Sequence, residues 1–132
     1  MNSILLSIKP EFVQKIIREE KRYEYRRRLC KQEIERIYIY ATWPVKLVVA
    51  EAEVTGRMEG EKDYIWNATK EYAGINEAYF EDYFDGLERA GAYCLGKITV
   101  YDHGRPLSEF GLKAAPQSYA YVKKSDNSEN TR

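Results

Sequence analysis

The chain has 132 residues, with 21 basic and 21 acidic side chains and a hydrophobic content of 44%. This length and composition indicate one folded domain and exclude a disordered chain. A membrane protein is also excluded, because the longest apolar stretch, residues 45–50, is short and contains a lysine. The chain start lacks the pattern of a secretory signal, so we expect a cytoplasmic protein with no membrane partner.

Metal binding is not expected. The two cysteines, Cys30 and Cys94, are far apart, and His103 is the single histidine. These residues cannot supply the four nitrogen and sulfur ligands of a zinc site, so both cysteines are expected to be buried thiols. No sequence signal indicates a cofactor.

The balanced net charge hides an asymmetry along the chain. Residues 1–40 hold ten basic and six acidic side chains, whereas residues 41–90 hold five basic and eleven acidic ones. The basic excess is densest between Arg18 and Arg28. Proteins that coat long duplex DNA usually carry a larger overall positive charge. A solvated basic stretch is the default interpretation of this pattern, and a local site for one phosphate or a few nucleotides is the alternative.

A strand, a helix and a charged strand are predicted first. Residues 4–8 are apolar and have the length of a strand. Pro10 suits the first turn of a helix, and the apolar spacing after it predicts a helix over 10–20. Tyrosines alternate with charges over 21–28, which predicts a strand. One face of this strand would carry Tyr23 and Tyr25. The other face would carry the charged residues Arg22, Glu24, Arg26 and Arg28.

The rest of the chain is predicted to alternate strands with two short helices. Strands are expected over 36–42, 45–55, 90–101 and 117–122, helices over 61–72 and between Asn76 and Gly86, a turn over 102–106, and a loop or short helix over 107–112. The helical tyrosines, expected to pack in the core, are Tyr64, Tyr72, Tyr79 and Tyr83. This order predicts one α+β domain over 1–122, with a small, mostly antiparallel sheet closed as a β-barrel, and a frayed tail over 123–132.

The strongest candidate site is the trio Lys21, Glu24 and Arg26. Arginine donates a fork of N–H groups, glutamate accepts from an amino group, and lysine meets a phosphate or a carbonyl. A surface ladder of cross-strand ion pairs is the other interpretation, and composition alone favours it. Motifs for a phosphate loop, a nucleophile elbow or a Cys-His pair are missing, although a lysine whose pKa is lowered by burial could act as a general base.

Residues 19–26 read Glu-Glu-Lys-Arg-Tyr-Glu-Tyr-Arg. They resemble the motif G-x-K-x-x-E-x-R of ASCH domains (activating signal cointegrator homology), with Glu19 in place of the glycine, which puts the tight turn before the strand in question. Residues 42–46 and 116–122 resemble further parts of that family, so the resemblance covers about 4–122. It implies a PUA-like β-barrel with a few flanking helices, and binding of RNA or a nucleotide in a cleft lined by the motif. The candidate binding residues are Ser7, Lys9, Lys21, Glu24, Arg26, Arg28, Thr42 and Tyr119.

Three functions remain open. The first is an RNA-binding or modified-nucleotide-binding module, with a role in transcription or RNA metabolism. The second is an amidohydrolase acting on an N4-acylated cytidine, because some small bacterial members use the motif lysine, a threonine and a distant glutamate. Lys21 and Glu24 are then the catalytic candidates; Glu24 stands at the threonine position, and Glu51 and Glu53 are candidates for the distant glutamate. The third is a module that binds a protein partner through the acidic stretch 59–88.

Overall fold

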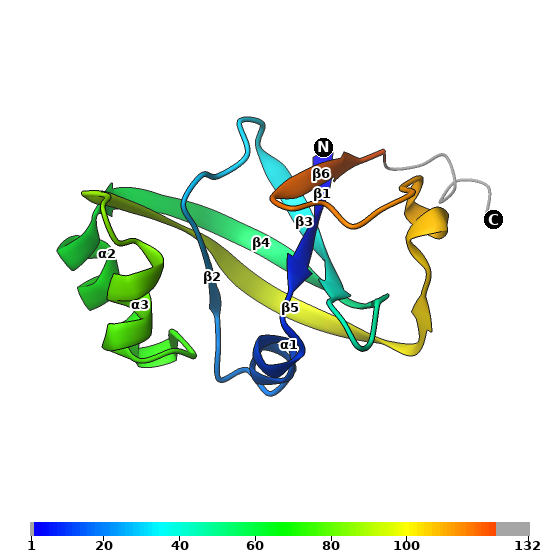
Figure 1. The fold of residues 1–132 in the computed structure, drawn as a ribbon, viewed down its shortest axis with the longest axis horizontal. Helices are drawn as coiled ribbons and strands as arrows, with labels where there is room; N and C mark the ends of the chain where they lie inside the picture. The colour runs from blue at the N-terminus through cyan, green and yellow to red at the C-terminus, as the bar shows by residue number, and fades with distance from the viewer. Residues whose placement is uncertain (1, 124–132) are drawn as a thin grey trace.

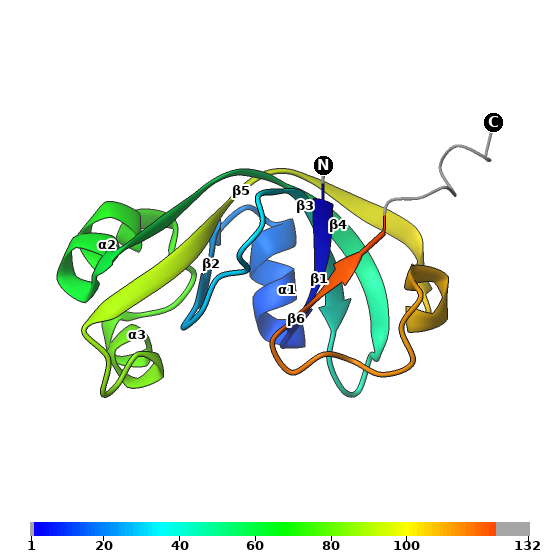
Figure 2. The ribbon, with the colours of Figure 1, turned by 90° about the horizontal axis from the view of Figure 1, so that it is seen from above.

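The computed structural model describes residues 2–123 and arranges them as one curved sheet with helices at its concave side and at one end (Figures 1 and 2). The elements are β1 (Asn2–Ile8), α1 (Pro10–Ile17), β2 (Tyr23–Arg26), β3 (Ile34–Ala41), β4 (Leu47–Glu61), α2 (Lys62–Thr69), the 3-10 turn η1 (Lys70–Tyr72), α3 (Glu77–Tyr83), β5 (Arg89–Arg105), the 3-10 turn η2 (Leu107–Phe110) and β6 (Tyr119–Val122). No helix in this part of the chain is both long and apolar enough to cross a bilayer. Of the tail expected over 123–132, residues 124–132 lie outside the described part.

The six strands form one sheet in the order β2-β5-β4-β3-β1-β6. β1 runs parallel to β3, and every other neighbouring pair is antiparallel. The predicted mixed α+β class with a mostly antiparallel sheet is therefore confirmed.

The prediction of a closed barrel is wrong. The edge strands β2 and β6 each pair with one neighbour and have four residues each. No backbone hydrogen bonds are formed between β2 and β6, and the side chain of Arg26 spans the opening between them. Its Nη2 donates to the Ser7 carbonyl at 2.9 Å and its Nη1 to the Ser118 carbonyl at 3.5 Å. Short edges and a charged side chain in the gap oppose strand-to-strand closure.

β4 and β5 are longer than predicted, at 15 and 17 residues. They pair from Val48 opposite Arg105 to Glu61 opposite Arg89, so the turn predicted over 102–106 is instead mostly strand. Figure 1 shows this ribbon reaching beyond the other strands and carrying α2 and α3 at its far end. The ribbon therefore places two helices, distant in sequence from β1, on the same side of the molecule as β2.

The described residues form three hydrophobic clusters, and two of them border the region of β2. The main cluster joins β1, β3 and α1, and includes Ile4, Leu6, Val13, Ile16, Ile37 and Ile39. The second cluster joins β2, α2 and α3, and includes Tyr25, Ile65, Phe80, Phe84 and Ala92. The buried aromatic residues of the α3 segment are the phenylalanines, whereas Tyr64, Tyr72 and Tyr79 are exposed. The prediction that these three tyrosines are core residues is therefore wrong, because α2 buries Ile65 and Thr69 instead, and α3 buries Phe80.

Two local signals set the ends of the helices. Pro10 is at the first turn of α1, as predicted, and the Asn76 side chain accepts from the Tyr79 amide at 2.8 Å, which confirms the predicted cap of α3. α1 ends at Ile17 rather than at residue 20. Glu19 then adopts a left-handed conformation with φ 62°, which an α-helix cannot accommodate. The turn of the family motif thus forms with glutamate where the motif has glycine.

Candidate nucleotide-binding pocket

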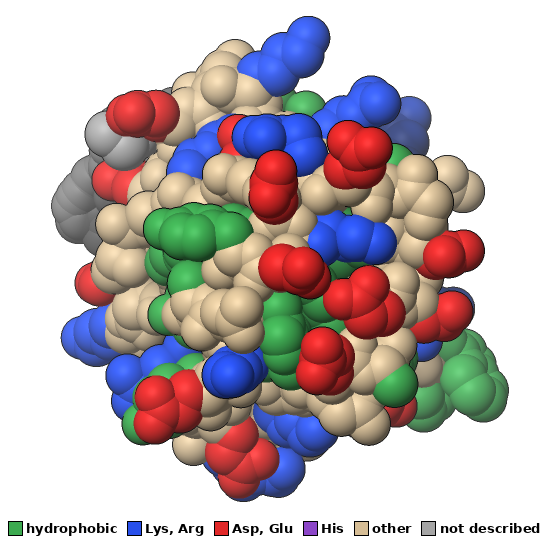
Figure 3. Space-filling view, turned by 90° about the vertical axis from the view of Figure 1, so that its left-hand side faces the viewer, with side chains coloured by type: hydrophobic (Ala, Val, Ile, Leu, Met, Phe, Trp, Pro, Cys, Tyr) green, Lys and Arg blue, Asp and Glu red, His purple; other side chains and the backbone are tan. Residues whose placement is uncertain are grey.

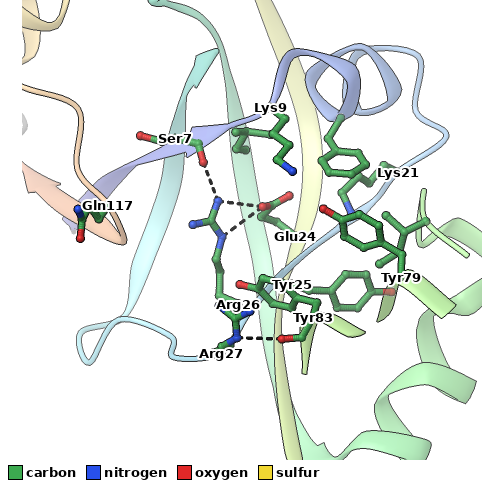
Figure 4. Close-up of a pocket in the computed structure, with 13 residues that line it drawn as sticks. Ser7, Lys9, Lys21, Glu24, Tyr25, Arg26, Arg27, Tyr79, Tyr83 and Gln117 are labelled. Atoms are coloured by element: carbon green, nitrogen blue, oxygen red, sulfur yellow. Dashed lines mark hydrogen bonds and ion pairs between the residues drawn. The ribbon is translucent and has the colours of Figure 1, made fainter. Parts of the chain in front are cut away.

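A cavity of about 250 Å³ lies where the sheet fails to close (Figure 4). β1 contributes Ser7 and Ile8, and the segment just before β6 contributes Gln117. The opposite walls come from β2, from α1 through Phe12, and from α3 through Tyr79. The pocket therefore has a polar wall formed by Ser7 and Gln117, an aromatic wall formed by Phe12 and Tyr79, and charged residues of the β2 segment between them.

Lys21 lies at the bottom of this pocket and is buried, with 4% of its surface exposed. Its ammonium donates to the Ala73 carbonyl at 2.8 Å and lies 4.8 Å from the centre of the Tyr25 ring. Burial lowers the pKa of Lys21 below the usual lysine value, and the Glu24 carboxylate opposes this shift. A buried lysine of lowered pKa is able to donate as an ammonium or, once neutral, to accept a proton.

The loop before α3 holds Lys21 in place through a close approach at Gly74. Gly74 has φ 72°, and a Cβ placed there would lie 2.5 Å from the Cβ of Lys21. The carbonyls of this loop accept from two lysines, since Lys15 donates to Gly74 at 2.9 Å and Lys21 donates to Ala73. Glycine is therefore required here both for its backbone conformation and for the space that Lys21 fills.

Glu24 is the buried anion of the pocket. Its Oε2 accepts from both Nε and Nη2 of Arg26, at 3.2 and 3.0 Å. Its Oε1 is buried and has no hydrogen-bond partner within residues 2–123. A buried acceptor left unpaired costs about 1–3 kcal/mol, which a donor from a bound molecule would offset. Figure 4 shows the carboxylate between Arg26 and the lysine side of the pocket.

The aromatic side of the pocket includes two tyrosines that the sequence pattern assigned to the core. Phe12 meets Tyr79 edge to face, with the ring centres 5.5 Å apart. Tyr83 is half-buried, and the guanidinium of Arg27 stacks over its ring at 4.1 Å. The sequence does carry one signal for this side, because Tyr79 and Tyr83 are four residues apart and so share a face of the helix.

Five of the eight predicted binding residues line the pocket. They are Ser7, Lys9, Lys21, Glu24 and Arg26. The structure does not bring the other three to it. Arg28 is exposed beyond the end of β2, and Thr42 belongs to the turn between β3 and β4, where its amide donates to the Ile8 carbonyl at 3.0 Å. Tyr119 packs against the main cluster and the ring of Tyr121.

The two glutamates considered for a catalytic role also lie outside the pocket. Glu51 is bound by Arg36 at 3.2 Å and by the Tyr101 hydroxyl at 2.8 Å. Glu53 stands opposite Arg36 in the pairing of β3 with β4. Neither lines the cavity around Lys21. In residues 2–123, no group of three or more His, Cys, Asp or Glu side chains is arranged to hold a metal ion.

Comparison with known proteins identifies the family. The chain is 33% identical over 131 residues to a Zymomonas mobilis protein named ASCH domain-containing ribonuclease, and the match covers 92% of this chain and 85% of that one. The chain belongs to the ASCH domain family. No family model matches the chain. A weaker relative is the large ribosomal subunit protein uL22 of Ureaplasma parvum, 25% identical over 122 residues, of which the match covers 39%.

Solved structures agree with this assignment to the ASCH family. The crystal structure of ASCH from Zymomonas mobilis superposes with a TM-score of 0.86 at 28% identity, over 98% of this chain and 93% of that one. A tyrosine-to-phenylalanine variant of the Zymomonas mobilis protein superposes with a TM-score of 0.87 at 27% identity, over 99% and 97% of the two chains. The ASCH resemblance of residues 19–26 is therefore confirmed at the level of the whole fold.

One end of this ASCH domain is acidic. Residues 59–88 hold nine acidic and two basic side chains. Figure 3 shows acidic side chains gathered around hydrophobic ones on the face that α2 and α3 occupy. Tyr64 on this end is 65% exposed. The negative charge of this end repels anions that approach the molecule from that side.

Proposed function

We propose that this ASCH domain binds single-stranded RNA and places one base in the pocket around Lys21 and Glu24. The observation that carries the proposal is the buried Glu24 Oε1, which has no partner in the described part of the chain. The exocyclic amino group of cytosine or adenine is a donor that would satisfy it, as in the recognition of unpaired bases on their Watson–Crick edges. The family relative named as a ribonuclease supports RNA as the ligand.

The other walls of the pocket suit the same ligand. The ammonium group of Lys21 makes one hydrogen bond among the described residues, to the Ala73 carbonyl, so its other N–H groups are available for a base carbonyl or a phosphate. The rings of Tyr79 and Phe12 offer apolar surface beside it. Bases stack on aromatic side chains without strong sequence preference, at about 1–3 kcal/mol per base. A zero net charge and a small pocket favour an unpaired nucleotide over a duplex.

The proposal is tested by fluorescence anisotropy with labelled single-stranded RNA oligomers of mixed sequence. Glu24→Gln and Lys21→Met should each weaken binding about tenfold or more, because each removes a charge-assisted hydrogen bond. Arg28→Gln is the matched control, since it removes a positive charge from the same segment outside the pocket. Circular dichroism shows whether the variants fold. Equal affinity for all four proteins would exclude the pocket as the binding site.

Cleavage of RNA is the second candidate, favoured by the lowered pKa of Lys21. Neutral Lys21 would take the proton of a ribose 2′-hydroxyl as its oxygen attacks the adjacent phosphorus. The bond from phosphorus to the 5′-oxygen would break, and that oxygen would leave with a proton from solvent. The relative named as a ribonuclease supports this reaction.

Lys21→Arg separates cleavage from binding. Arginine keeps the positive charge but does not lose its proton in a protein. The variant should therefore retain RNA in the anisotropy assay and leave labelled RNA intact on a denaturing gel. Cleavage at the rate of the unmodified protein would rule out Lys21 as the base. A separate NMR assay follows the deacylation of an N4-acylated cytidine, because Lys21 would act as the base in that reaction as well.

A further inference from the structure

We propose that Arg27 is a phosphate-binding residue at the rim of the pocket, so that the ligand is a nucleotide phosphate rather than a free nucleoside. This inference rests on the proposed function and extends it from the base to the backbone. Arg27 lies outside the motif trio and is not among the binding residues predicted from the sequence. Its side chain lines the pocket next to Tyr83 (Figure 4).

The two neighbouring arginines of β2 and its end have different roles. Arg26 uses Nε, Nη1 and Nη2 in hydrogen bonds to Glu24, Ser7 and Ser118. Arg27 uses its Nε alone, which donates to the Tyr83 carbonyl at 2.8 Å. Its two terminal nitrogens have no protein partner within the described residues. Arg26 therefore braces the fold, while Arg27 keeps the donor pair that an anion requires.

The guanidinium of Arg27 is also already oriented by contacts within the protein. The stacking on Tyr83 at 4.1 Å and the hydrogen bond from Nε fix the plane of the guanidinium. The side chain nevertheless remains exposed. A planar fork whose orientation is already fixed loses little conformational entropy on binding, and it matches two phosphate oxygens at once.

Lys9 is the other exposed cation of the pocket, which it lines from the end of β1. Its side chain is exposed and makes no hydrogen bond or ion pair among residues 2–123. Lys9 would have to lose the rotamer freedom of its whole side chain on binding a phosphate, whereas Arg27 has lost most of that freedom already. The pre-organised group is therefore the better site for a phosphate.

The inference is tested by calorimetric titration with adenosine, cytidine and their 3′- and 5′-monophosphates. The quantity of interest is the ratio of the nucleoside Kd to the nucleotide Kd. We expect a ratio of about ten or more for at least one phosphate position, since a charge-assisted pair is worth at least that factor. Arg27→Gln should bring the ratio close to one. Arg27→Lys should retain part of it, because charge remains without the fork. The control Arg28→Gln should keep the full ratio.

Each outcome has a distinct meaning. A ratio near one in the unmodified protein, or an unchanged ratio in Arg27→Gln, overturns the role of Arg27. A ratio lost in Lys9→Gln and kept in Arg27→Gln assigns the phosphate to Lys9 and also overturns it. If nucleosides bind and Glu24→Gln weakens their binding, the proposed base pocket stands, even when the phosphate does not change the affinity. Failure of all nucleosides and monophosphates to bind overturns the role of Arg27, whereas the proposed function is decided separately by the affinity for RNA oligomers and its dependence on Glu24.

Discussion

Glu24 and Arg26 share a face of β2, and both nitrogens that Arg26 directs at Glu24 bind the same oxygen, Oε2. The carboxylate is thereby fixed in orientation while Oε1 stays unpaired within residues 2–123. Arg26 also reaches the carbonyl of Ser7 on the other edge of the opening. The pair therefore has two functions, since it holds the edges of the open sheet together and presents one acceptor to the pocket.

Removal of Arg26 is expected to destabilise the protein strongly. Arg26→Met leaves the Glu24 carboxylate buried without its partner and should lower the free energy of unfolding by about 3 kcal/mol. Urea unfolding followed by circular dichroism measures the change. The neighbouring Arg28→Met should change it by less than about 0.5 kcal/mol, because Arg28 is exposed. Similar effects of the two substitutions would contradict the bracing role.

The titration of Lys21 should depend on Glu24 in a defined direction. The carboxylate raises the pKa of Lys21 against the larger effect of burial. Glu24→Gln removes this negative charge and should lower the pKa of Lys21 further. NMR of ¹³C-labelled lysine side chains measures the midpoint, with Lys21→Arg identifying the signal. A midpoint that rises or stays constant in Glu24→Gln would contradict the stabilisation of the Lys21 ammonium by Glu24.

Gly74 is expected to control the position of Lys21. Gly74→Ala places a Cβ against the Lys21 side chain as well as in a left-handed conformation. Gly86→Ala is the matched control, because Gly86 has φ 83° and a Cβ added there would meet nothing within 4 Å. Both substitutions should cost about 1 kcal/mol from the backbone. Gly74→Ala should cost more and should also weaken RNA binding; equal stability and equal binding in the two variants would contradict this.

Alkaline pH should destabilise the protein through Tyr25. Burial raises the pKa of Tyr25 to about 12 from the usual 10.0. Between these two values the unfolded chain loses the phenol proton and the folded chain keeps it, so the stability contributed by this group falls as pH rises. The slope is at most about 1.4 kcal/mol per pH unit for one tyrosine. Urea unfolding between about pH 9 and pH 11 should show a shallower fall in Tyr25→Phe, and identical slopes would refute the assignment.

Local signals predicted the elements that carry the charged trio. Pro10 and the apolar spacing after it set the start of α1, and the alternation over 21–28 correctly predicts that Glu24 and Arg26 lie on one face. Asn76 likewise caps α3 through its own side chain. These features depend on residues within a few positions of one another, which a single sequence displays directly.

The pocket itself depends on long-range packing, which local patterns do not display. Helical spacing gave Tyr79 and Tyr83 a common face, but the length of the β4–β5 ribbon decides what that face meets. The alternation of β2 could not distinguish Arg27 from Arg28, because the strand ends at Arg26 and the next two residues follow their tertiary neighbours. The prediction of sheet closure failed for the same reason, since closure depends on edges far apart in the chain.

The pocket lies on the boundary between the main hydrophobic cluster and the second one. Ile8 and Phe12 belong to or pack against the main cluster, whereas Tyr25 and Tyr83 belong to or pack against the second. A molecule seated there touches both and acts as a removable cross-link between them. Binding of a ligand in the pocket should therefore slow amide hydrogen exchange in α1 and α3 together. The two parts of the domain should then open as one cooperative unit when the pocket is occupied.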